Sequence, residues 1–342
     1  MQQNKTISYL LIIISSITLL VVGKDLIIPF VLALLIWFLI VEFRTLLEKI
    51  PYVGNKFPRW VWTILSSLIL FSISGIIVDV LIHNIQDLSQ NIPKYEENLL
   101  IFNDNINTKY DIDLNANLQN YIGAFKLSNI LKSLFASLTE IFGNAFMIIL
   151  YVLFILLEET VFGDKMKAFF TTKSKYDDAN STLSAINKSI SSYISLKTII
   201  SLITGASSYI ALLAIGVDTP IFWAFLIFLL NYIPTIGSLI GTVFPAIIAL
   251  MQFGDATYFF LVIGIVGAIQ LIVGNIIEPK IMGNSLNLSP LVVIISLSIW
   301  GSIWGITGMV LSVPITVIMI ILFAQFESTK SIAILLSEKG KV

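Results

Sequence analysis

The amino-acid sequence predicts an all-α, polytopic integral membrane protein with about eight transmembrane segments. Of its 342 residues, 57% are hydrophobic and only 12% are charged, whereas a globular domain carries about 25% charged residues. The deficit is greatest between Thr198 and Phe326, where the charged residues are Asp218, Asp255, Glu278 and Lys280. A water-soluble helix needs a polar face, so we expect lipid to surround this half of the chain.

The uncharged windows of the sequence support the number of segments. A helix crosses the hydrocarbon core of a bilayer with about 17–25 predominantly apolar residues. Eight uncharged windows approach or exceed that length: 6–23, 26–41, 60–78, 141–157, 198–217, 219–254, 256–277 and 281–326. Only Lys24 and Asp25 separate the first two windows, which predicts a tight helical hairpin.

The lysine and arginine residues predict the orientation. Cytoplasmic loops of membrane proteins carry an excess of these residues, and here most of the 20 basic residues lie near the ends or in the loops 42–59 and 158–197. The segment 83–139 has four lysines against six acidic residues, so we place it outside the membrane on the opposite face. Both termini are therefore expected in the cytoplasm, and three regions follow: a three-span region 1–82, an extracytoplasmic helical segment 83–139 and a C-terminal core 140–342.

Some helices are expected to extend beyond the bilayer. Apolar residues recur at three-to-four spacing over 77–92, 130–141 and 183–194, which is typical of helices with one apolar face. The first two repeats predict that the third span continues outward and that a second helix returns. The Asn- and Asp-rich stretch 103–117 is the expected turn between them, and the third repeat leads into the fifth span.

The window 219–254 is too long for one simple span. Its middle reads NYIPTIG (231–237), in which Pro234 removes a backbone donor and clashes with the preceding turn of a helix. Asn231 and Thr235 offer polar groups beside the backbone atoms that are freed. The window is therefore either one kinked helix or a re-entrant hairpin, and the sequence leaves both open.

The window 281–326 is interrupted in a similar way. Pro290 opens its long apolar stretch, WGSIWGITG (300–308) lies in the middle and Pro314 follows. Pairs of glycines four residues apart, Gly237 with Gly241 and Gly301 with Gly305, fit the small-residue contact motif of membrane helices. Two interpretations remain: glycines that only allow close packing, or broken helices that line a site.

Glu278 is the ionisable residue that lies between these two windows. It occurs in GNIIEPK (274–280), with Gln270 two helical turns upstream, and ionisable residues within membrane segments are functional candidates. One interpretation is an interfacial carboxylate paired with Lys280. The other is a desolvated carboxylate without a cationic partner, able to exchange protons near neutral pH. Asp218 and Asp255 occur at turns, where we expect them to be solvated.

Other classes of chemistry have little support in the sequence. There is no cysteine and a single histidine, His83, which excludes a two-histidine metal site. A Gly-x-Ser-x-Gly nucleophile motif and a phosphate-binding loop are absent, so no catalytic residue, cofactor or metal is predicted. A net charge of −1 offers no basic surface for nucleic acid.

Three stretches in the C-terminal half resemble one bacterial permease family. They are AFLIFLLNYIPTIG (224–237), GNIIEPKIMG (274–283) and LSPLVVIISLSIWGSIWGITGMVLSVP (288–314). Together they are similar to the AI-2E family, the autoinducer-2 exporters. The resemblance implies a homo-oligomeric secondary transporter of the bacterial inner membrane, with 140–342 as its transport core.

The resemblance and the interrupted windows together define the expected site residues. The solute or ion pathway is expected to include Asn231, Pro234, Thr235, Gly237, Gln270, Asn275, Glu278 and Pro279. Helix packing or hinge positions are expected at Gly241, Pro290, Gly301, Gly305, Gly308 and Pro314.

Three functions remain open at this point. The first is export of a small polar solute, with autoinducer-2 as the quorum-sensing candidate. The second is Na⁺(Li⁺)/H⁺ antiport with Glu278 as the proton carrier, and the third is a membrane scaffold without flux. The expected partners are the lipid bilayer and either a small molecule or a monovalent cation.

Overall fold

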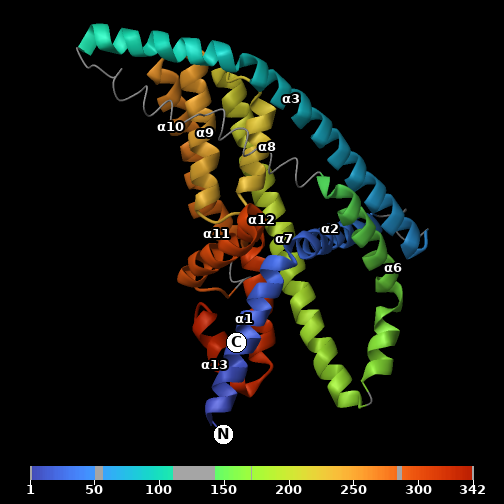
Figure 1. The fold of residues 1–342 in the computed structure, drawn as a ribbon. Helices are drawn as coiled ribbons and strands as arrows, with labels where there is room; N and C mark the ends of the chain where they lie inside the picture. Colours follow the sequence, from blue (N-terminus) through green and yellow to red (C-terminus); the bar gives the residue numbers. More distant parts are fainter. Residues whose placement is uncertain (1, 51–56, 111–142, 171, 283–286, 341–342) are drawn as a thin grey trace. The chain divides into compact units, whose positions relative to one another are not determined.

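The computed structural model describes residues 2–50, 57–110, 143–170, 172–282 and 287–340, and they are overwhelmingly helical (Figure 1). The elements are α1 (Gln2–Val22), α2 (Lys24–Glu48), α3 (Arg59–Tyr110), α6 (Ala145–Phe169), α7 (Lys173–Ile215), α8 (Pro220–Leu230), α9 (Ile236–Phe253), α10 (Ala256–Ile272), the π-helix η1 (Val273–Ile277), α11 (Glu278–Met282), α12 (Pro290–Ala324) and α13 (Glu327–Leu336). Within the described ranges, seven helices are long and apolar enough to cross a membrane. The all-α, polytopic membrane fold is thereby confirmed.

The helices form two compact units. Unit 1 comprises Met1–Ser66, Asn144–Ser195 and Asn284–Val342, and unit 2 comprises Ser67–Gly143 and Leu196–Gly283. Large apolar side chains remain exposed along the long helices, for example Phe146 at 73% and Leu239 at 65%. Apolar surface of this extent is unfavourable in water and matches a lipid environment.

α1 and α2 meet at a corner (Figure 1), so the prediction of a tight hairpin at this point is wrong. Gly23 alone separates the two helices, and its neighbours keep helical hydrogen bonds, Gly23 N to Leu19 O at 2.8 Å and Ile27 N to Gly23 O at 2.9 Å. A single residue is too short a connection for a helix to reverse its direction.

The helical extensions predicted for the third and fifth spans are confirmed. α3 continues to Tyr110 and buries Leu81 and Leu88, and α7 runs from Lys173 into its apolar half without a break. Residues 103–110 of the expected turn 103–117 are helical, so this part of the prediction is wrong. The rest of that stretch lies outside the described residues. The repeat 130–141 lies outside the described residues.

α8 and α9 form an antiparallel hairpin, so the first interrupted window, 219–254, is a hairpin and not one kinked helix. Gln252 near the end of α9 bonds Asp218, two residues before α8, with Gln252 Oε1 accepting from Asp218 N at 2.7 Å. α8 has 11 residues, which rise about 16 Å, roughly half of the ~30 Å hydrocarbon core. Pro234 and the positive φ of Thr235 (61°) lie in the turn between the helices.

α12 is a second hairpin rather than one long helix. Its backbone leaves the helical conformation at Trp304 and at Gly305, whose φ of 60° and ψ of −139° suit glycine. The two arms pack together, since Ser296 Oγ donates to Ser312 O at 3.0 Å and lies 2.5 Å from Thr316 Oγ1. Both interrupted windows are therefore hairpins.

α10, η1 and α11 form one continuous stretch with a wider turn in the middle. Asp255 caps α10 by accepting a hydrogen bond from Thr257 N at 2.8 Å, and this bond lowers the pKa of its carboxyl. In η1 the amide of Glu278 bonds Val273 O, five residues back. The extra residue accommodates Pro279, which has no amide hydrogen and clashes with the preceding turn of an ordinary α-helix.

Candidate functional site

A partly buried ion pair joins Lys197 of α7 to Glu278 at the start of α11. Lys197 Nζ lies 2.5 Å from Glu278 Oε1, and the two side chains are 5% and 25% exposed. The hypothesis of a carboxylate without a cationic partner is therefore wrong. The alternative of a pair with Lys280 is wrong as well, because Lys280 is exposed and Glu278 bonds Lys197.

Local backbone geometry explains this pairing. A wide π-turn shifts the residues that follow onto a different face of the helix, and such turns are frequent at functional sites. Here η1 ends immediately before Glu278. Lys197 continues the buried face of α7 that includes Ile190 and Ile194. Sequence reasoning missed Lys197, because it was counted only among the basic residues of a predicted cytoplasmic loop. The signal that could have found it is its helical spacing from Ile190 and Ile194.

The turn between α8 and α9 contacts α7 next to the ion pair. Thr198 Oγ1 and Tyr232 Oη lie 2.6 Å apart, and Asn231 Nδ2 donates to Ser201 Oγ at 3.0 Å. Asn231 and Ser201 are buried. The site of unit 2 therefore combines one ion pair, three hydroxyls and one amide, contributed by α7, the α8–α9 turn and the η1–α11 junction.

The other predicted pathway residues occupy different positions. Asn275 lies on an exposed face, where its amide bonds Leu271 O of its own helix. Gln270 is buried, and its Nε2 has no hydrogen-bond partner among the described residues. Pro234 and Thr235 lie in the α8–α9 turn, and Pro279 follows Glu278 in α11.

Glycines allow the two arms of each hairpin to approach. A Cβ on Gly237 would overlap Leu230 O, and one on Gly241 would lie 3.2 Å from Ile227 Cγ1 and 3.4 Å from Gln270 Nε2. In the α12 hairpin, a Cβ on Gly308 would overlap Trp300 O. These three glycines therefore lie at close helix contacts.

The remaining hinge and packing positions belong to the α12 hairpin. Gly301 faces Met309, because a Cβ on Gly301 would lie 3.0 Å from the Met309 side chain. Gly305, in contrast, has open space around it and a positive φ. Gly305 therefore forms the turn rather than a contact. Pro290 occupies the first turn of α12, and Pro314 is buried in its second arm.

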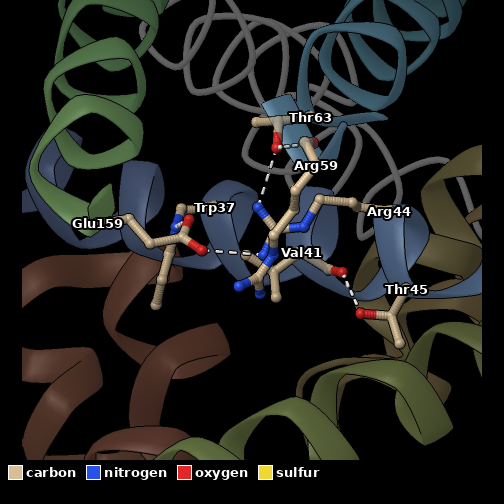
Figure 2. Close-up of polar contacts among 7 residues, drawn as sticks. All are labelled: Trp37, Val41, Arg44, Thr45, Arg59, Thr63 and Glu159. Atoms are coloured by element: carbon tan, nitrogen blue, oxygen red, sulfur yellow. Dashed lines mark hydrogen bonds and ion pairs between the residues drawn. The ribbon is translucent and has the colours of Figure 1, made fainter. Parts of the chain in front are cut away.

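A second ion pair fastens three helices of unit 1 (Figure 2). Arg44 Nη2 of α2 lies 2.9 Å from Glu159 Oε1 of α6, and Trp37 Nε1 donates to the other carboxylate oxygen at 2.9 Å. Arg44 Nη1 also donates to Thr63 Oγ1 of α3 at 3.0 Å. We call these four residues the Arg44 clamp.

A third polar cluster ties α3 to the open end of the α8–α9 hairpin. Tyr95 Oη donates to Asp218 Oδ2 at 2.7 Å, Gln252 Nε2 donates to Asp218 Oδ1 at 3.1 Å, and Asn98 Nδ2 donates to Gln252 O at 2.7 Å. Asp218 is therefore half-buried and bonded. The expectation that it is simply solvated is wrong.

The site of unit 2 has the properties expected of a binding site for polar solutes in a membrane protein. Non-helical backbone at membrane depth is tolerated where it lines a cavity or is buried in protein, and transporters bind substrates at discontinuous helices. Among the described residues, no group of three His, Asp or Glu side chains gathers as metal ligands. The fold and the site together define a membrane protein of the transporter class.

The chain belongs to the AI-2E transporter family, because the model of that family, described as AI-2E family transporter, matches residues 7–328. The AI-2 transport protein TqsA of Escherichia coli (strain K12) is 32% identical over 323 residues, covering 93% of this chain and 91% of TqsA. A Haemophilus influenzae protein, provisionally named as a transport protein, is 29% identical and covers 99% of each chain. YhhT of E. coli K12, also provisionally named as a transport protein, is 40% identical over 149 residues, covering 44% of this chain and 42% of YhhT. The family predicted from the sequence is thereby confirmed.

Proposed function

We propose that this chain exports a small polar solute, with autoinducer-2 as the first candidate, and that the solute is bound beside the Lys197–Glu278 pair. The observation that carries the proposal is the pair itself, part-buried where the adjacent residues of α7 contact the turn between α8 and α9. Removing two charges from water costs several kcal/mol per ion in a protein interior. Hydrophobic residues at both positions would avoid that cost, so a charged pair at this point favours a role in binding.

The groups around the pair are suited to a polar solute. Thr198, Ser201, Asn231 and Tyr232 provide hydroxyl and amide groups that both donate and accept hydrogen bonds. The name of TqsA supports autoinducer-2 as the solute to test first. The proposal is of transport without a catalysed reaction.

The alternatives have weaker support from this geometry. In a Na⁺(Li⁺)/H⁺ antiporter Glu278 would be the proton carrier, but here its carboxylate is paired with Lys197. A scaffold without flux has no use for a buried polar face beside a broken helix.

The setting of the protein is part of the proposal. We place it in the bacterial cytoplasmic membrane with both termini in the cytoplasm, which the excess of basic residues in the predicted inner loops supports. We also propose a homo-oligomer, to be tested by native mass spectrometry of the purified protein.

Flux in proteoliposomes tests the proposed function. The purified full-length chain is reconstituted, and efflux of labelled autoinducer-2 is compared with a pH-dye signal under imposed sodium gradients. The test variant is the neutral double substitution Lys197→Gln with Glu278→Gln, which leaves no unpaired charge. Lys280→Gln is the matched control because Lys280 is exposed and two positions from Glu278.

We expect wild type and Lys280→Gln to export the solute and the neutral double variant to lose most of its flux. Export by the double variant at the wild-type rate would show that the pair is not part of the binding site. Sodium-dependent proton movement without autoinducer-2 flux in the wild type would replace the proposal with antiport.

A further inference from the structure

The Lys197–Glu278 pair leaves hydrogen-bonding capacity unused. A lysine ammonium has three hydrogens to donate, and Lys197 Nζ makes one bond among the described residues, to Glu278 Oε1 at 2.5 Å. The second carboxylate oxygen, Glu278 Oε2, accepts no bond from those residues. The Lys197 side chain is only 5% exposed, and buried polar groups normally have hydrogen-bond partners. The pair therefore offers unused donors and an unused acceptor side by side.

The pair lies at one end of the apolar part of α7 and is partly open at its surface. Lys197 directly precedes the uncharged window 198–217, and the stretch from Lys197 to Ile215, the last residue of α7, rises about 27 Å. That length is close to the ~30 Å hydrocarbon core. Glu278 is 25% exposed, and Lys280 is exposed. The pair is therefore placed near a face of the membrane, where a solute can reach it.

The charges of this site sum to zero. The ammonium of Lys197 and the carboxylate of Glu278 cancel each other. The other side chains of the site are uncharged: Thr198, Ser201, Asn231 and Tyr232. Asp218 follows the far end of α7, and Asp255 precedes α10, whereas Glu278 comes after it. An ion bound beside the pair would stay without a compensating charge in a partly buried setting, which is costly.

Hydroxyl groups fit the unused donors and acceptor of the pair. A hydroxyl both donates and accepts hydrogen bonds, so one hydroxyl of a solute can accept from Lys197 Nζ while a neighbouring hydroxyl donates to Glu278 Oε2. Hydrogen bonds to an ionised group are about twice as strong as those between neutral groups. The ion pair stays intact in this arrangement, whereas a zwitterion would have to separate it to pair with both charges.

We propose that the Lys197–Glu278 pair is a charge filter, which admits uncharged solutes with neighbouring hydroxyl groups and excludes ions of either sign. The filter rests on the proposed function and defines the class of solute for the same site. Its selectivity depends on both charges, because specificity is a difference between the affinities for two solutes. A site left with the charge of Lys197 alone favours an anion, and a site left with the charge of Glu278 alone favours a cation.

Competition in proteoliposomes tests the filter. The full-length protein exports labelled autoinducer-2 in the presence of one unlabelled competitor: uncharged ribitol, anionic ribonate, cationic ribitylamine or zwitterionic serine. The first three compounds have the same carbon skeleton and differ at one carbon, so their size is matched. The variants are Glu278→Gln and Lys197→Gln. Lys280→Gln is the control, because it removes an exposed charge that lies outside the pair.

We expect ribitol to inhibit export by the wild type and by Lys280→Gln several-fold more strongly than the other competitors. The order should reverse in favour of ribonate in Glu278→Gln and in favour of ribitylamine in Lys197→Gln. A pair with a structural role alone would lower export in both variants without reversing the order. Equal inhibition by ribitol and ribonate in the wild type, or none by ribitol, would overturn the filter and leave autoinducer-2 export standing.

Thermal unfolding in detergent separates the filter from export. A ligand that binds the folded protein raises its unfolding midpoint, so ribitol should raise the midpoint of the wild type and ribonate should not. The swapped variant Lys197→Glu with Glu278→Lys keeps a neutral pair and should keep the preference for ribitol. Stabilisation by ribitol alone in a wild type that exports no autoinducer-2 would support the filter and overturn the proposed export. Equal stabilisation by ribonate would overturn the filter.

Discussion

Lys197 and Glu278, 81 positions apart in the chain, meet in an ion pair of 2.5 Å inside unit 2. Because the pair has no net charge, α7 and the start of α11 can meet here without leaving a free ion. The pair also fixes which faces of these helices meet, since a slip of one residue would separate the two charges.

The stability of the protein should depend on both partners of this pair. Glu278→Gln leaves Lys197 buried and charged, and we expect it to lower the free energy of unfolding by about 3–5 kcal/mol. The double variant Lys197→Met with Glu278→Gln should lose less than the sum of the single variants. Thermal unfolding in detergent measures the cycle, and strictly additive losses would show that the two side chains do not interact.

The Arg44 clamp should be a structural element of unit 1. Arg44→Met leaves Glu159 without its cation, and we expect a loss of about 3–5 kcal/mol. Trp37→Phe removes one hydrogen bond to the carboxylate and should cost about 1.5–3 kcal/mol. Glu158→Gln is the control, because its partner Lys165 and Glu158 itself are 61% and 50% exposed. A control as damaging as Arg44→Met would contradict this assignment.

Glycines at the hairpin contacts should not tolerate a methyl group. Gly237→Ala and Gly308→Ala place a Cβ on a backbone carbonyl oxygen, and we expect losses of about 1–3 kcal/mol or more. Gly264→Ala in α10 has open space and should raise stability by about 0.5–1 kcal/mol, because alanine favours a helix. The unfolding midpoints of the three variants test this prediction, and equal midpoints would show that Gly237 and Gly308 do not lie at close contacts.

The predicted orientation can be tested with single cysteines, since the chain has none of its own. Glu97→Cys in α3 should react with an impermeant thiol reagent in intact cells or spheroplasts. Ser174→Cys in α7 should react only after permeabilisation. Both positions are exposed, and the opposite labelling pattern would invert the topology.

The sequence was sufficient for the features that depend on composition and on local interruptions. The membrane fold follows from the scarcity of charged residues over 198–326, and the breaks near Pro234 and Gly305 occur inside windows too long for one span. The choice between kink and hairpin required contacts such as Ser296 with Ser312. Those contacts depend on how two arms pack, which a local pattern does not specify.

The candidate site was only partly predictable for the same physical reason. Glu278 and Asn231 stood out because polar residues are rare in their surroundings. Lys197 lies 81 positions from Glu278, and the π-helix immediately before Glu278 changes the helix face on which that carboxylate lies. Asn275 was grouped with Asn231 as a polar residue, but its helix places it on an exposed face.

The separation of Lys197 from Glu278 along the chain has a consequence for biosynthesis. The ribosome completes α7 before it makes Glu278, and at about 5–20 residues per second the intervening 81 residues take roughly 4–16 s. During this interval Lys197 lacks the carboxylate with which it pairs in the folded chain. We therefore expect α7 to reach its final packing in unit 2 only after α10 and α11 have been made, so that chains truncated before Glu278 lack this contact.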